Sequence, residues 1–265
     1  MRGPRVLVTR AAHQASGLLE ALTAVDLDPV LVPAIEIEFA AGTAELDEAL
    51  RRITTYRWVI VTSPNGAEAV LRGLERVLTP FEGTSWAVIG EATSATLQEA
   101  GADVSFQPSV STSAAFAAEL PINPGDRVLL VRGNLASAET ARALELRGAV
   151  VDDLVGYRTV QAPDASRPLL RRAFQSERPV VVVFTSGSTV RGLLELAARE
   201  GIDVRSIPAV CIGNPTAVEA RNAGFPVAAI SVDAYAVALA EATVRAVREL
   251  HLSASVSTRS GGREP

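Results

Sequence analysis

Short runs of apolar residues recur along the chain, and most are followed by a segment with the apolar periodicity of a helix. The run RVLVTR, residues 5–10, precedes a segment with apolar residues at i, i+3, i+4 and i+7 spacing: Ala15, Leu18, Leu19, Leu22 and Val25. WVIVTSPNG (58–66) and AVIGEAT (87–93) begin the same strand-then-helix pattern. Alternation of buried strands with helices predicts a parallel sheet covered by helices, the α/β class.

The pattern starts again after the turn cluster PINPGD, residues 121–126. Three later segments repeat earlier ones 122 or 123 positions on: RVLLVR (127–132) repeats RVLVTR, FTSGS (184–188) repeats VTSPN, and CIGNPT (211–216) repeats VIGEAT. A shared register indicates an internal duplication, so we predict two similar doubly wound α/β lobes. A tandem division near Pro121 is the simplest reading of this repeat.

Two stretches alternate between apolar and other residues, AIEIEF (34–39) and DLVGYRTVQA (153–162). Alternation is typical of a strand with two different faces. The second stretch lies where one repeat closes and the next opens. We therefore expect it to join the two lobes.

The 265 residues and 48% hydrophobic content fit two domains of roughly 130 residues each. No apolar run approaches the roughly 18 residues of a membrane span, and MRGPRVLVTR enters a strand where a signal peptide would place an apolar helix. A soluble, cytoplasmic protein is the expectation. Residues 251–265 have no period and are rich in Ser, Gly and Arg, which predicts a flexible tail.

Composition excludes several kinds of chemistry. Cys211 is the single cysteine and the chain has two histidines, so disulfides and thiolate metal sites are excluded. All 25 basic residues are arginine, which excludes Schiff-base chemistry and a P-loop lysine. The net charge of −5 gives no general attraction to nucleic acid or to a membrane surface. No GxGxxG or GxSxG motif supports a nucleotide-binding or hydrolase site.

Ligands of an open parallel sheet bind beyond the carboxyl ends of its strands, where helices begin. Arginine, hydroxyl and glycine residues follow the apolar runs at such places in both repeats: Arg10, Thr62, Ser63, Gly90, Thr93, Arg132, Gly133, Ser186, Gly213 and Thr216. Helix N-termini carry partial positive charge, so this set predicts a site for a polyanion. Any one of these hydroxyl residues taken alone is more often an ordinary helix cap than a ligand.

The order and spacing of these segments resemble the uroporphyrinogen-III synthase family over nearly all of residues 4–250. The likeness is carried by the early TR and by VTSPNGAEAV, VIGEATSATLQEAGADV, RVLLVRGN, RGAVVDDLVGYRTV, FTSGSTVRGL and CIGNPTAVEARNAGFPV. It implies two flavodoxin-like lobes joined by a two-stranded β-ladder hinge, with the active site in the cleft between them. One lobe would comprise residues 1–36 and 164–250, and the other the inserted residues 40–160.

The family resemblance implies cyclisation of hydroxymethylbilane, a linear tetrapyrrole with eight carboxylates, to uroporphyrinogen III with loss of water and inversion of ring D. It implies no cofactor and no metal. Tyr157 matches the family tyrosine proposed to assist departure of the hydroxyl, and Thr93 and Thr216 match threonines that face the cleft. Ser63 and Ser186, at the matching strand ends, would bind carboxylates. We expect a monomer that acts on this small molecule without nucleic-acid or membrane partners.

Two alternatives remain open at this point. Two duplicated α/β lobes on a double hinge also describe non-catalytic proteins that bind or sense small anions or tetrapyrroles. In that case Tyr157 is a side chain that packs across the ladder. A nucleotide-binding flavodoxin-like protein is disfavoured because no phosphate loop is present.

Overall fold

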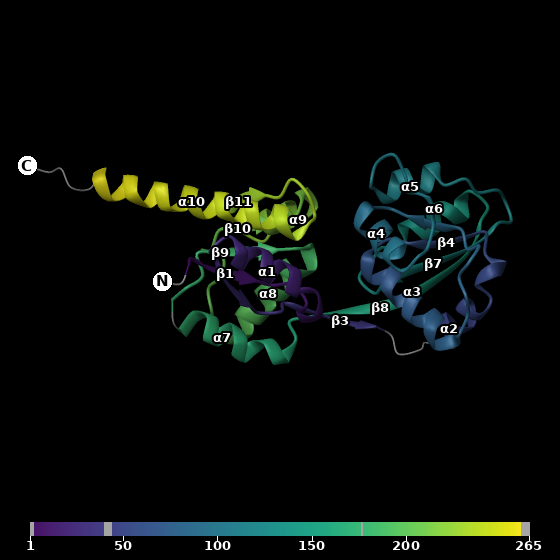
Figure 1. Cartoon of the computed structure of the whole chain (residues 1–265), viewed down its shortest axis with the longest axis horizontal. Helices are drawn as coiled ribbons and strands as arrows, with labels where there is room; N and C mark the ends of the chain where they lie inside the picture. Colours follow the sequence, from purple (N-terminus) through teal and green to yellow (C-terminus); the bar gives the residue numbers. More distant parts are fainter. Residues whose placement is uncertain (1–2, 40–43, 176, 261–265) are drawn as a thin grey trace, which may run out of the picture. The chain divides into compact units, whose positions relative to one another are not determined.

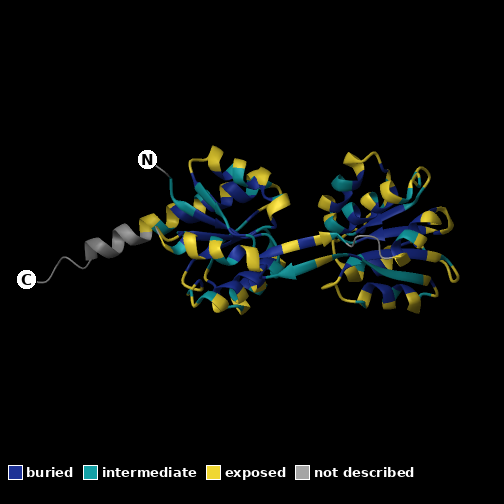
Figure 2. Cartoon of the chain, turned by 90° about the horizontal axis from the view of Figure 1, so that it is seen from below, coloured by how far each residue is buried: buried dark blue, intermediate teal, exposed yellow. Residues whose placement is uncertain are grey.

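The computed structural model describes residues 3–39, 44–175 and 177–260, which form two mainly parallel sheets covered by helices (Figure 1). The chain divides into two compact units, Met1–Glu36 with Val160–Pro265 (unit 1) and Ile37–Thr159 (unit 2). The apolar runs of the sequence are the central strands, which are buried on both faces, whereas the outer sides of the helices are exposed (Figure 2). The predicted α/β class is confirmed.

Unit 1 contains a five-stranded sheet in the order β11-β10-β9-β1-β2. Its strands are β1 (Arg5–Val8), β2 (Asp28–Leu31), β9 (Val181–Phe184), β10 (Ala209–Cys211) and β11 (Val227–Ile230). Its helices are α1 (Ser16–Ala24), α7 (Arg167–Gln175), α8 (Gly187–Glu200), α9 (Asn214–Asn222) and α10 (Ala236–Ser260), with short 3-10 turns η1 (Ala12–Gln14) and η3 (Asp164–Ser166).

Alternate residues of these strands supply the two cores of unit 1. Val6 and Val8 of β1 pack with α1 and α10. Leu7, between them, belongs to the opposite core, which includes α7, α8, α9 and the buried Cys211. Burial on both faces explains why the strands are apolar without interruption.

Unit 2 repeats this arrangement in a six-stranded sheet, β3-β8-β7-β4-β5-β6. Its strands are β3 (Ile35–Phe39), β4 (Trp58–Val61), β5 (Trp86–Val88), β6 (Val104–Phe106), β7 (Arg127–Gly133) and β8 (Val150–Gln161). One core contains α2 (Ala44–Arg51), α3 (Pro64–Val77) and α4 (Glu91–Glu99), and the other contains α5 (Ser113–Glu119) and α6 (Glu139–Leu146). The 3-10 turn η2 (Ile53–Thr55) leads into β4.

The two sheets have corresponding strand orders, because β8-β7-β4-β5-β6 matches β2-β1-β9-β10-β11. This is the flavodoxin-type doubly wound order. In unit 2 the first strand of this five-stranded set along the chain is β4, so β7 and β8 come last although they correspond to β1 and β2. The simple tandem division near Pro121 is therefore wrong: β7, which follows that turn, pairs with β4, which precedes it.

β3 and β8 are neighbours in the six-stranded sheet, and the boundaries of both units fall within them. In β3, Ile35 and Ile37 are buried whereas Glu36 and Glu38 are exposed, so the predicted alternation is present. Where the two segments enter unit 1, the Ala162 amide donates to the Ala34 carbonyl at 2.9 Å. Helix α8 packs against this point through Gly192, where a Cβ would lie 2.0 Å from the Ala34 oxygen.

The C-terminal segment differs from expectation. α10 continues to Ser260, so residues 251–260 are helical; residues 261–265 lie outside the described residues. The reason is compositional: no glycine or proline interrupts the chain between Pro226 and Gly261, and Ala, Leu, Ser and Arg all tolerate a helix. Among the described helices, none has the length and apolar character needed to cross a bilayer.

The Gly192 contact generates a stability prediction. Gly192→Ala should lower the free energy of unfolding by about 1–3 kcal/mol, because the new methyl group meets main-chain atoms that no rotamer change can remove. Gly17→Ala is the matched control, since a Cβ there meets nothing within 4 Å. That variant should be unchanged or more stable by up to about 1 kcal/mol. Urea unfolding followed by circular dichroism measures both; equal midpoints would show that the Ala34 segment can move away.

Candidate active site

Three of the residues predicted from the sequence come together at the carboxyl edge of the unit 2 sheet. Tyr157 of β8 lies opposite Gly133 of β7. Its hydroxyl is 3.0 Å from the Ser63 Oγ, which follows β4. A Cβ on Gly133 would lie 2.6 Å from the Tyr157 Cζ and 2.8 Å from its hydroxyl oxygen. The phenol end of Tyr157 thus occupies space that only glycine leaves free.

Ser63 is also the N-cap of α3. Its Oγ accepts a hydrogen bond from the Gly66 amide at 3.1 Å, and Pro64 occupies the first helical position. The Ser63 oxygen accepts from Gly66, and the hydroxyl proton of Ser63 remains free to be donated to the Tyr157 oxygen. The phenol then keeps its proton for another acceptor.

The neighbouring helix α4 begins differently. Gly90 is its N-cap, and no side chain caps the helix. Thr93, the third helical residue, is only 3% exposed. Within the described part of the chain, its hydroxyl makes no hydrogen bond. A hydroxyl without a partner among the described residues and first-turn amides are thus available at one helix end, which is the arrangement that binds an anion.

Unit 1 repeats both kinds of helix start. Ser186 caps α8 by accepting from the Thr189 amide at 3.3 Å and lies 2.8 Å from the Ser188 hydroxyl. Gly213 begins α9 without a side-chain cap, and Thr216 is 5% exposed. Its hydroxyl also has no hydrogen-bond partner among the residues that the structure describes. Each unit therefore has one serine-capped helix and one glycine-started helix at its carboxyl edge.

Arg10 and Arg132 occupy corresponding places but differ in their partners. Arg132 donates to Asp153 through Nε (2.7 Å to Oδ1) and Nη2 (2.9 Å to Oδ2), and its Nη1 donates to the Ala136 carbonyl at 2.9 Å. The hydrogen bonds to Asp153 raise the pKa of the Arg132 guanidinium. Arg10, in contrast, makes no hydrogen bond or ion pair within residues 3–39, 44–175 and 177–260, and burial lowers its guanidinium pKa.

The strand register explains this difference. In unit 1, Val8 pairs with Leu31; the corresponding pair of unit 2 is Leu130 with Asp153. The position of Asp153, which pairs with Arg132, is therefore occupied in unit 1 by the apolar residue Leu31. Arg10 is left as a partly buried cation without a counter-ion among the described residues.

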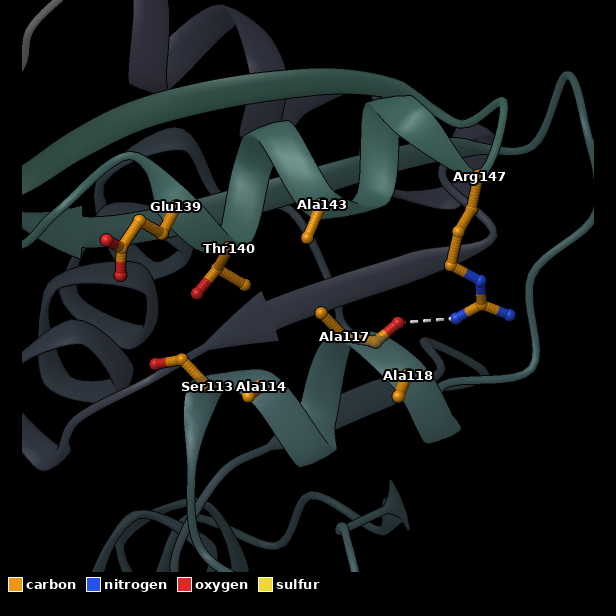
Figure 3. Close-up of a pocket in the computed structure, with 8 residues that line it drawn as sticks. All are labelled: Ser113, Ala114, Ala117, Ala118, Glu139, Thr140, Ala143 and Arg147. Atoms are coloured by element: carbon orange, nitrogen blue, oxygen red, sulfur yellow. Dashed lines mark hydrogen bonds between the residues drawn. The ribbon is translucent and has the colours of Figure 1, made fainter.

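Thr62 lies apart from the phenol, in a small cavity of about 80 Å³ that also contains Arg132, Ser113 and Thr140. This cavity adjoins a groove of about 410 Å³ between α5 and α6 (Figure 3). Ser113 and Thr140 face one another across that groove, and Arg147 at its other end donates to the Ala117 carbonyl. None of the residues predicted to bind substrate lines the larger groove, half of whose lining residues are alanine.

Comparison with known proteins identifies the family. The family model described as "Uroporphyrinogen-III synthase HemD" matches residues 16–241. A porphyrin biosynthesis protein HemD of Ruminiclostridium josui is 29% identical over 228 residues, 83% of this chain; the match spans only 44% of that relative's length. A uroporphyrinogen-III synthase of Synechococcus elongatus is 29% identical over 238 residues, which cover 83% of this chain and 86% of the relative.

Solved structures agree on the fold. A mutant uroporphyrinogen III synthase of Thermus thermophilus superimposes with a TM-score of 0.68 at 19% identity, covering 93% of this chain and all of that one. The uroporphyrinogen-III synthetase of Helicobacter pylori gives a TM-score of 0.60 at 17% identity, covering 92% and 99%. The family match extends over most of both units, and these folds are the same. The chain belongs to the uroporphyrinogen-III synthase family.

Proposed function

We propose that this chain cyclises hydroxymethylbilane to uroporphyrinogen III, with loss of water and inversion of ring D, in tetrapyrrole biosynthesis. Membership of the family and the names of the relatives support this reaction over non-catalytic anion sensing. The observation that carries it is the phenol of Tyr157, held 3.0 Å from Ser63 at the start of α3.

Tyr157 donates its proton to the departing hydroxyl, so the carbon–oxygen bond breaks with release of water and leaves an azafulvene-type cation. Ser63 donates a hydrogen bond to the phenol oxygen as negative charge develops there, and the N-terminus of α3 stabilises the same charge. Ring D attacks through its substituted position to give a spiro intermediate, which fragments and closes with ring D inverted. The proton lost as the last pyrrole is restored returns to Tyr157.

The substrate's eight carboxylates need local positive sites on a protein of net charge −5. We infer that Arg10 binds one of them, because its guanidinium is partly desolvated and has no acid beside it. Thr93 and Thr216, with the helix starts at Gly90 and Gly213, bind others; each helix end contributes about 0.3–1 kcal/mol. We also include Ser186 and Thr62 among the proposed substrate-binding residues, because each lies just after the end of a strand. Arg132 contributes to substrate binding mainly by anchoring the loop at Ala136.

We further propose a monomeric cytoplasmic enzyme that needs no cofactor and has no nucleic-acid partner. The net charge of −5 supports the last point, because nucleic acid attracts basic surfaces. Among the described residues no group of three or more His, Cys, Asp or Glu is placed to hold a metal ion.

The first test is the isomer that the protein makes. Purified protein supplied with freshly generated hydroxymethylbilane should yield uroporphyrinogen III, because the enzyme must hold ring D against direct closure. Without protein, the substrate closes spontaneously to the type I isomer. Chromatographic separation after oxidation to the porphyrins distinguishes the two. A product that is only type I would exclude the synthase function.

Tyr157→Phe should lower kcat by about a hundredfold with the fold retained, since removal of a positioned proton donor has an effect of this order. Tyr235→Phe is the matched control, because Tyr235 is 59% exposed and lies outside the proposed site. Steady-state kinetics give kcat, and circular dichroism reports the fold. If Tyr157→Phe matched the wild type, Tyr157 would return to a packing role.

Arg10→Gln should raise KM roughly tenfold with little change in kcat, because one charge-assisted hydrogen bond to a carboxylate is lost in both ground and transition states. Stability should hold, since Arg10 has no described partner to leave unpaired. Arg142→Gln, on the exposed side of α6, makes the same change in net charge and should leave KM within twofold. A similar rise in KM for both variants would mean that only net charge matters.

A further inference from the structure

The pairing of β7 with β8 contains one extra residue directly before Tyr157. From Arg127 opposite Val150 to Arg132 opposite Val155, the strands advance one residue for one. The register then shifts, and Gly133 lies opposite Tyr157. Gly156 is therefore a β-bulge, a feature that re-aims the following side chain. The bulge determines that Tyr157, and not its neighbour, faces Gly133.

Close packing leaves the bulge little freedom. A Cβ on Gly156 would lie 2.4 Å from the Val131 Cγ1 and 3.1 Å from the Ala69 Cβ. The backbone of β8 thus rests directly on β7 and α3 at this residue. The phenol ring of Tyr157 packs directly against Gly133.

Beyond the bulge, Asn134 holds β8 where β7 has ended. Its backbone amide donates to the Tyr157 carbonyl at 3.2 Å. Its side-chain Oδ1 accepts from the Thr159 amide at 2.8 Å. If β7 continued as a regular strand, a main-chain carbonyl of β7 would accept this hydrogen bond. The Asn134 side chain supplies the acceptor in its place. Tyr157 is fixed at its own carbonyl and again two residues later.

The loop that carries Asn134 is itself anchored. The Ala136 amide donates to the Gly133 carbonyl at 3.1 Å, and Arg132 binds the Ala136 carbonyl while it pairs with Asp153. Asn134 is exposed, so its hydrogen bond is not part of the hydrophobic core. The Thr159 amide that loses this partner on substitution can turn to water, and the fold is expected to survive.

We propose that Asn134 is a positioning residue for Tyr157, which keeps the phenol beside Ser63 by clamping β8 after the Gly156 bulge. The inference rests on the proposed role of Tyr157 in the reaction. Asn134 acts through the strand and does not touch the substrate. Its loss should therefore change the rate of the chemical step and leave substrate binding largely unaltered.

Asn134→Ala removes the Oδ1 acceptor, whereas Asn134→Asp retains a carboxylate oxygen in its place. Asn134→Ala should lower kcat roughly tenfold, the order expected for a small misplacement of a reacting group, with KM within twofold. Asn134→Asp should keep at least half of the wild-type kcat. Asn123→Ala is the matched control, since Asn123 is an exposed loop asparagine whose recorded hydrogen bonds use backbone atoms.

Two further measurements separate positioning from general damage. In a Tyr157→Phe background, Asn134→Ala should change the residual kcat less than twofold, because the hydroxyl through which it acts is gone. With 3-fluorotyrosine at the three tyrosines of the chain, the Tyr157 fluorine resonance should shift or broaden in Asn134→Ala and recover in Asn134→Asp. The Tyr56 and Tyr235 resonances should not move.

An unchanged kcat, an unchanged Tyr157 resonance, or an equal loss of kcat in both backgrounds would overturn the inference. These outcomes are distinct from failure of the proposed function. If the wild type formed no type III isomer, the reaction would be wrong, whereas the fluorine spectra would still report whether Asn134 orders Tyr157.

Discussion

Parallel pairing of the strands is the constraint from which the site follows. Among the strands that pair in parallel, the carboxyl ends meet at one edge of the sheet, so each helix that follows such a strand begins at that edge. This brings Ser63, after β4, within hydrogen-bonding distance of Tyr157 in β8, although 94 positions separate them. An antiparallel sheet would send half of these residues to the opposite edge.

The helix starts at this edge divide into two kinds, and the division has a chemical meaning. Ser63 and Ser186 satisfy the amides of α3 and α8 with their own oxygens. A capped helix end has fewer free amides for a ligand. The capping hydroxyl can still hydrogen-bond a neighbouring side chain, as Ser63 does with the phenol of Tyr157. Gly90 and Gly213 leave α4 and α9 without a side-chain cap. Those two helix ends retain the electrostatic attraction for an anion.

Much of this could be predicted from the sequence, because strand ends and helix starts are local features. The apolar runs located the strands, the 122- and 123-residue repeat indicated two similar lobes, and the motifs led to the family that the comparisons confirm. The cap interpretation of Ser63 and Ser186 was also available from local rules, and both residues are caps. Helix α10 extends to Ser260, past the predicted boundary at residue 251, because a segment of weak apolar periodicity can still be helical.

Contacts that depend on register could not be predicted. The sequence placed Arg10 and Arg132 as equivalents, but whether an arginine meets an acid depends on the residue of the adjacent strand, Leu31 in one sheet and Asp153 in the other. The Gly156 bulge has no signal beyond a glycine in a strand. The role of Asn134 could not be predicted for the same reason: its position after a strand is typical of a helix cap, but its side chain accepts a hydrogen bond from the adjacent strand instead.

The two duplicated units therefore differ in the residues that they place at corresponding positions. Where unit 2 has Gly133 and Asn134, unit 1 has Ala11 and Ala12 at the positions 122 residues earlier, so it lacks both the space for a phenol and the clamp. Unit 1 instead retains an arginine without a described counter-ion, whereas unit 2 uses its arginine to anchor a loop. One copy of the fold thus presents positive charge and the other presents an oriented proton donor. In the proposed reaction Arg10 binds a substrate carboxylate and Tyr157 donates the proton, so the sequence differences between the copies fall at the residues to which these roles are assigned.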